Sequence, residues 1–140
     1  MVKRFTILSL LLMLAVGLSL LGCSGGVASK ETSTAGNAVE RGKILVEAVM
    51  LGENKAPGCT TCHSLEAGKV IIGPSLAGIA TDAETASAGK SAQAFLRESI
   101  IDPDAVIAEG FPAGVMYQNY ATDLSDEEIN DIVAYLLTLK

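Results

Sequence analysis

The chain has 140 residues, of which 49% are hydrophobic and 19% charged, and its formal net charge is −6. This length leaves room for one domain once any targeting segment is removed. The acidic balance argues against nucleic acids and anionic lipids as binding partners.

The first residues predict export. Lys3 and Arg4 precede an uncharged, mainly apolar run from Phe5 to Leu21, which is the layout of a secretory signal. The run has 17 residues, near the lower limit for a membrane-spanning helix. An uncleaved membrane anchor is therefore the alternative to a cleaved signal.

The run ends in Leu20, Leu21, Gly22 and Cys23, a sequence that resembles the lipobox of bacterial lipoproteins. This resemblance implies that residues 1–22 are removed and that Cys23 carries lipid as the mature N-terminus. We therefore expect an extracytoplasmic chain, periplasmic or on the outer face of the cytoplasmic membrane, that is lipid-anchored to a bacterial membrane. Eight basic and sixteen acidic residues then remain, a formal charge of −8.

After Cys23, residues 24–36 are small and polar and predict a flexible linker. The pattern from residue 37 to residue 140 is helical. Asn37 is the expected N-cap of a first helix, with Glu40 three residues later as in a capping box. One face of this helix should carry Ala38, Gly42, Leu45 and Val49.

Two further helices are predicted. Residues 91–100 form one, which should stop before Pro103. The last helix begins near Ser125, which makes a capping box with Glu128. Its apolar stripe contains Ile129, Ile132, Val133 and Leu136.

The sequence CTTCH at residues 59–63 contains two of the three cysteines and the only histidine. A thioredoxin-type dithiol would accompany a βαβ pattern, which is absent, and a structural zinc ion would need four convergent ligands. A disulfide between Cys59 and Cys62 leaves His63 unexplained. Cys-x-x-Cys-His is typical of covalent haem attachment, in which both thiols bond to the haem and the histidine binds its iron.

With this motif between two capped helices, the chain from Ala38 to Lys140 resembles a class I cytochrome c. The family has an N-terminal helix, the attachment motif, a loop with a distal methionine and a C-terminal helix, in that order. The resemblance implies an all-α cytochrome c fold, with three to five short helices around one covalently attached haem c. It also implies that Gly42 on the first helix lies close to Tyr135 on the last.

The resemblance extends to the segment IIGPSLAGI at residues 71–79. In the family, the proline of a Gly-Pro-x-Leu segment accepts a hydrogen bond from the proximal imidazole, which orients the ring and raises its basicity. Pro74 matches that proline. Leu76 is expected to pack on the haem.

The second axial ligand should be Met116, in the loop where the family places its distal ligand. One histidine cannot supply two imidazole ligands, and Met50, at the end of the first helix, is expected to be a core residue. Many family members have proline after the ligand methionine, whereas this chain has Tyr117. We expect Tyr117 to line the haem edge or to hydrogen-bond a propionate.

These features predict a one-electron carrier, not an enzyme. Its expected partners are membrane-bound donor and acceptor complexes of a respiratory or photosynthetic chain, together with the lipid membrane that holds its anchor. Two alternatives stay open. One is the haem domain of a larger oxidase- or peroxidase-type assembly, and the other is a haem-based ligand sensor if Met116 binds loosely.

Overall fold

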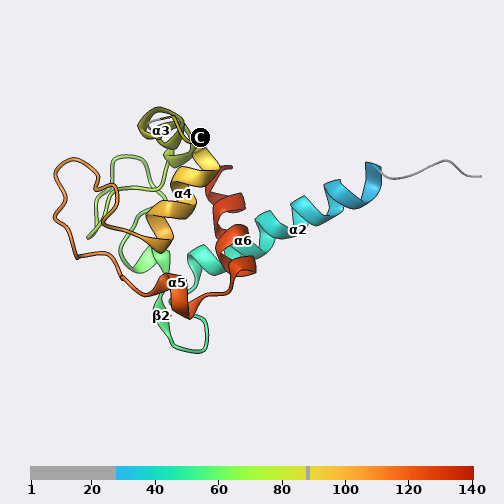
Figure 1. The fold of residues 1–140 in the computed structure, drawn as a ribbon, viewed down its shortest axis with the longest axis horizontal. Coiled ribbons are helices and arrows are strands. Elements are labelled where there is room, and N and C mark those ends of the chain that lie inside the picture. Colours follow the sequence, from blue (N-terminus) through green and yellow to red (C-terminus); the bar gives the residue numbers. More distant parts are fainter. Residues whose placement is uncertain (1–27, 88) are drawn as a thin grey trace, which may run out of the picture. The chain divides into compact units, whose positions relative to one another are not determined.

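The computed structural model describes residues 28–87 and 89–140, with side chains from residue 37 onward. The predicted signal peptide and Cys23 lie outside the described residues. In chain order the elements are α2 (Ala28–Glu47), β1 (Met50–Leu51), β2 (Ala56–Pro57), the 3₁₀ turn η1 (Cys59–Thr61), α3 (Ile79–Ala86), α4 (Ala92–Ile101), α5 (Tyr120–Asp123) and α6 (Asp126–Leu136). Figure 1 shows this arrangement.

The described part of the chain is mainly helical, as predicted. Its only sheet is the short antiparallel pair β1 and β2, within the described ranges. The helices α3 and α5 add to the three that the sequence predicts. No helix among the described residues is long and apolar enough to span a membrane.

The helix α2 differs from the prediction at both ends. It begins at Ala28 and not after Asn37, so the predicted cap is wrong and residues 28–36 of the expected linker are helical. That stretch contains no proline, and its Ala, Lys and Glu residues are good helix formers. Val49 lies beyond the end of the helix and is exposed, and Val46 takes the fully buried position.

Met50 is not the core residue that the sequence predicts, because 51% of it is exposed. It lies in β1, where successive side chains point to opposite sides of the strand. Leu51 therefore takes the inward position and is buried.

The helix α6 confirms the prediction in detail. Ser125 caps it, with the side chain of Ser125 accepting a hydrogen bond from the Glu128 amide and the Glu128 side chain accepting one from the Ser125 amide. The predicted apolar stripe is buried and consists of Ile129, Ile132, Val133 and Leu136. This stripe forms one wall of the hydrophobic core.

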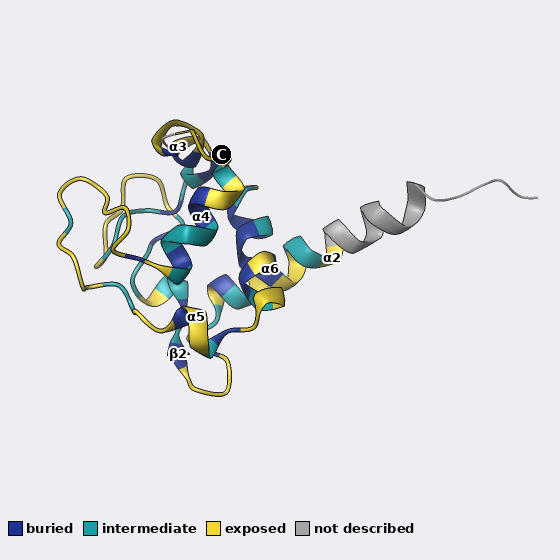
Figure 2. Ribbon diagram, in the orientation of Figure 1, coloured by how far each residue is buried: buried dark blue, intermediate teal, exposed yellow. Residues whose placement is uncertain are grey.

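The helix α4 supplies the facing wall. Ser91 caps it by accepting a hydrogen bond from the Ala94 amide, and it ends at Ile101, before Pro103, as predicted. Its buried side chains are Phe95, Leu96 and Ile100. The helices α4 and α6 pack against each other, and Figure 2 shows buried residues on both.

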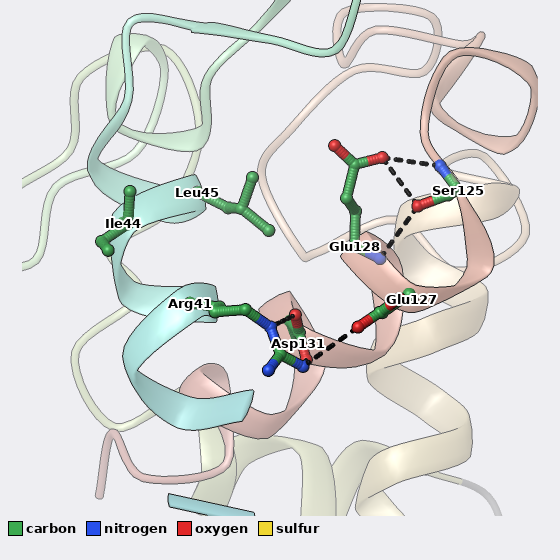
Figure 3. A pocket seen from close by; sticks show the side chains of 7 residues that line it. All are labelled: Arg41, Ile44, Leu45, Ser125, Glu127, Glu128 and Asp131. Carbon is green, nitrogen blue, oxygen red and sulfur yellow. Dashed lines mark hydrogen bonds and ion pairs between the residues drawn. The ribbon is translucent and has the colours of Figure 1, made fainter. Parts of the chain in front are cut away.

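The helices α2 and α6 cross at Gly42, close to Tyr135 as the resemblance implies. A Cβ atom at Gly42 would lie 1.8 Å from the carbonyl oxygen of Asp131 and 2.9 Å from Cβ of Tyr135. Beside the crossing, Arg41 donates to both carboxylate oxygens of the buried Asp131 and lies 3.4 Å from Glu127 (Figure 3). The surface hollow drawn there lies between the two helices, away from the Cys-x-x-Cys-His turn.

Candidate functional site

The two cysteines and the histidine of the motif lie in one tight turn, which η1 forms. The amides of Cys62 and His63 both donate to the carbonyl oxygen of Cys59, at 3.2 and 2.9 Å. Gly58, which starts the turn, packs so closely that a Cβ atom there would lie 1.7 Å from the carbonyl oxygen of Ala48. The end of α2 therefore fixes the position of the motif.

The imidazole of His63 is oriented by a backbone carbonyl. Its Nδ1 lies 2.8 Å from the carbonyl oxygen of Pro74. A carbonyl can only accept a hydrogen bond, so Nδ1 carries the ring proton. This tautomer leaves the lone pair on Nε2, the nitrogen that a metal could bind.

The segment after the motif folds back over it and holds Pro74 in place. The amide of Gly73 donates to the carbonyl oxygen of Cys62, and the amide of Leu76 donates to that of Ser64, both at 2.8 Å. Leu76 is buried in the core cluster. The structure thus brings His63, Pro74 and Leu76 together.

Gly73 is a site residue that the sequence reasoning missed. A Cβ atom at this position would lie 2.5 Å from Cε1 and 2.8 Å from Nδ1 of His63. Only glycine leaves room for the ring in this orientation. The available signal was a glycine directly before the proline that contacts the imidazole.

Met116 and Tyr117 lie at the end of a long loop, residues 102–119, and both are half-buried against the core. The carboxylate of Asp104 closes this loop by accepting a hydrogen bond from the amide of Gly114, at 2.9 Å. The Tyr117 hydroxyl donates to Asp123 at 2.5 Å, and this hydrogen bond raises the pKa of Tyr117. Asp123 thus holds the Tyr117 hydroxyl beside the core, and its role at the haem edge or at a propionate stays a prediction.

Tyr120 connects this loop to the motif and was also missed from the sequence. Its ring packs edge-on against Tyr117, with 5.1 Å between the centroids, and its hydroxyl donates to the carbonyl oxygen of Pro57 at 2.6 Å. Burial raises the pKa of Tyr120, and Cys59 and Cys62 are near enough to raise it further. Met116 thus directly precedes Tyr117, whose ring packs on Tyr120. Tyr120 in turn hydrogen-bonds the residue that precedes the attachment turn.

The side chains around the cysteines argue against a zinc site. Cys59 and Cys62 are free thiols, not a disulfide. Burial raises the pKa of the Cys59 thiol to about 11. Among the described residues, no three His, Cys, Asp or Glu side chains are placed to hold a metal ion.

The residues present fit a haem. Two thiols lie in one tight turn, an imidazole has its Nε2 lone pair available, and a thioether lies in a loop that packs against the same core as Cys59. Covalent haem attachment and axial ligation use this set of groups.

A family model described as Cytochrome c matches residues 39–140 of the chain. No curated protein and no solved structure gives a match. The matched range includes every site residue described above.

Proposed function

The chain belongs to the cytochrome c family, with the all-α fold and haem-based electron transport of that family, and from this premise we propose a specific carrier. It is a class I, mono-haem cytochrome c that is anchored to a membrane and exchanges single electrons with membrane-bound complexes of a respiratory or photosynthetic chain. The observation that carries the proposal is the orientation of the His63 ring. His63 directly follows the second thiol, and the Pro74 carbonyl holds its Nδ1.

We assign covalent attachment to Cys59 and Cys62, and the two axial positions to Nε2 of His63 and the sulfur of Met116. When bound, the haem supplies an iron centre that takes up and releases one electron. The Pro74 carbonyl holds the Nδ1 proton and so keeps Nε2 oriented as a ligand. With protein side chains in both axial positions, no position is left for a substrate, which favours electron exchange over catalysis.

The anchor belongs to the same proposal. Cys23 carries lipid, and the segment that follows it holds the haem domain near the membrane, outside the cytoplasm. Confinement of this kind raises the effective concentration of a carrier beside membrane-bound partners. Mass spectrometry of the native protein tests this part, since retention of residues 1–22 would assign them to an uncleaved anchor.

Covalent attachment is tested on a denaturing gel. The wild-type band should keep its haem stain, and the Cys59→Ser, Cys62→Ser double variant should lose it. Haem that is released from the unfolded wild-type protein would contradict the assignment.

Electron transfer is tested by redox titration of the purified protein. We expect a reversible change of one electron and no binding of carbon monoxide by the reduced protein. Carbon monoxide binding by the wild-type protein would favour the ligand sensor or the catalytic assembly, because it requires an axial position that a protein side chain does not hold firmly.

A further inference from the structure

Two segments that carry residues of the candidate site also expose large apolar side chains. The first is the attachment loop, residues 64–78, in which Val70, Ile71 and Ile72 are 61%, 48% and 52% exposed. These side chains lie close to the attachment turn, because Val70 forms an isolated β-bridge with His63 and the amide of Ile72 donates to the carbonyl oxygen of Cys62.

The second segment is the Met116 loop, residues 102–119. Val106 and Ile107 are exposed on it, and Val115, directly before Met116, is 50% exposed. Most of this loop is exposed, and in Figure 2 it extends to the left of α4. Exposed apolar side chains that gather on one surface usually mark a contact with another molecule.

The charges on the Met116 loop have one sign. From Asp102 to Leu139 the chain contains eight acidic residues and no lysine or arginine. On the Met116 loop, Asp102, Asp104 and Glu109 are exposed, and none of the ion pairs between described residues includes them. The apolar part of this loop is therefore bordered by unneutralised negative charge.

We infer that the six apolar side chains, Val70, Ile71, Ile72, Val106, Ile107 and Val115, form the docking surface for a redox protein whose own contact face has an apolar centre ringed by lysine and arginine. Basic groups on the partner complement the acidic border, which accelerates and orients the encounter. The apolar centres then exclude water from the contact. This inference rests on the proposed electron-carrier function.

The same charges disfavour two other occupants. A second copy of this chain would bring its own acidic border against the first, and an anionic lipid surface would repel the formal charge of −8 that remains after residue 22. A basic protein partner meets neither obstacle.

The electrostatic half of the inference is tested with two small oxidants of opposite charge, tris(phenanthroline)cobalt(III) and hexacyanoferrate(III). Each is mixed with the reduced holoprotein in a stopped-flow instrument over a range of ionic strength. Reaction with the cation should slow as salt is added, and reaction with the anion should become faster.

Charge-reversing substitutions test whether the Met116 loop causes this salt dependence. The Asp102→Lys, Glu109→Lys variant should shift the ratio of the two rate constants toward the anion by about tenfold. The control, Glu40→Lys with Glu47→Lys, makes the same change of net charge on exposed positions of α2. An equal shift in both variants would show that net charge alone acts, and would overturn the docking surface.

The apolar half is tested with a lysine-rich cytochrome c as the oxidant. Ile71→Ser and Val115→Ser should each slow the reaction several-fold, whereas Val49→Ser, which is also exposed but lies at the end of α2, should not. If Ile71→Ser changes the haem spectrum, that side chain belongs to the haem crevice. If the wild-type protein self-associates and Val115→Ser does not, the surface binds a second copy of the chain. Either result overturns the inference.

A failure of the proposed function would look different. A wild-type holoprotein that exchanges no electron with any of these reagents would overturn the carrier function and the docking surface together. Exchange that is insensitive to all the loop substitutions would overturn the docking surface alone.

Discussion

The carbonyl oxygen of Asp131 occupies the space that a Cβ atom on Gly42 would need, with only 1.8 Å between the two positions. This contact lets the backbones of α2 and α6 approach closely. In the middle of an exposed helix, Gly→Ala normally stabilises by up to about 1 kcal/mol. At this crossing we expect the opposite sign.

Gly42→Ala should therefore lower the free energy of unfolding by about 1–3 kcal/mol, because the helices must move apart. Chemical denaturation of the holoprotein measures this change. Lys43→Ala, on the exposed side of α2, is the control and should stay within about 0.5 kcal/mol of the wild type. A stabilising Gly42→Ala would mean that the helices do not cross at this residue.

Gly73→Ala should affect the haem environment more than stability. The new methyl group would lie 2.5 Å from Cε1 of His63, so the ring must turn and lose its bond to Pro74. We expect a changed haem spectrum and a shifted reduction potential. Gly68→Ala is the control, because a Cβ atom at Gly68, unlike one at Gly73, meets nothing within 4 Å. Gly68 has a positive φ of 71°, so the substitution should cost about 1 kcal/mol of stability and leave the spectrum unchanged.

Arg41→Gln should destabilise the protein because it leaves the carboxylate of Asp131 buried and without its partner. The Arg41 side chain is 45% exposed, so water can partly replace it, and we expect a loss of about 1–3 kcal/mol. Adding Asp131→Asn should recover part of this loss. Glu127→Gln, at the exposed edge of the pair, should cost less than about 0.5 kcal/mol.

The elements with strong local signals could be predicted from the sequence. Ser125 and Glu128 define the start of α6, and Ser91 and Pro103 bracket α4, because capping and proline act within a few residues of themselves. The attachment motif could be predicted for the same reason, since its chemistry lies within five consecutive residues.

The rest depends on contacts between distant segments. Asp131 pairs with Arg41 across 90 positions, and Tyr120 reaches Pro57 across 63. No local pattern marks such partners. The start of α2 was misjudged for a different reason: Asn37 has a capping side chain, but nothing before it forces the helix to end.

The stability of the holoprotein should fall at alkaline pH through Tyr120. Burial raises the pKa of its phenol above the ordinary value of about 10. Above that pH the unfolded chain loses the proton while the folded protein keeps it, so unfolding becomes more favourable as pH rises. The stabilisation that comes from the raised pKa of Tyr120 is present in full below about pH 10 and is lost as the pH rises further.

The comparison is between the wild type and Tyr120→Phe, unfolded with denaturant in the reduced state from neutral to alkaline pH. The variant should be less stable at neutral pH by about 1 kcal/mol, since it loses the bond to Pro57. Its stability should then fall less steeply above pH 10. Parallel curves would mean that Tyr120 does not titrate on unfolding.

Met116→Ala should change the haem chemistry because it removes the thioether assigned to the second axial position. The oxidised protein should lose its methionine-to-iron charge-transfer band and bind cyanide or imidazole, and the reduced protein should bind carbon monoxide. The reduction potential should fall, because methionine ligation favours the ferrous state. Visible and near-infrared spectroscopy follow the band and the binding of added ligands, and potentiometry measures the reduction potential.

Met50 provides the matched control, since it is the other methionine after the signal segment and is 51% exposed on β1. Met50→Ala should leave the spectrum unchanged and the free energy of unfolding within about 0.5 kcal/mol. Met116→Ala should also destabilise the protein, because the Met116 loop is exposed over most of its length and its contact with the core is concentrated near Met116 and Tyr117. If Met50→Ala, and not Met116→Ala, opened the second axial position to carbon monoxide, the axial assignment would be wrong.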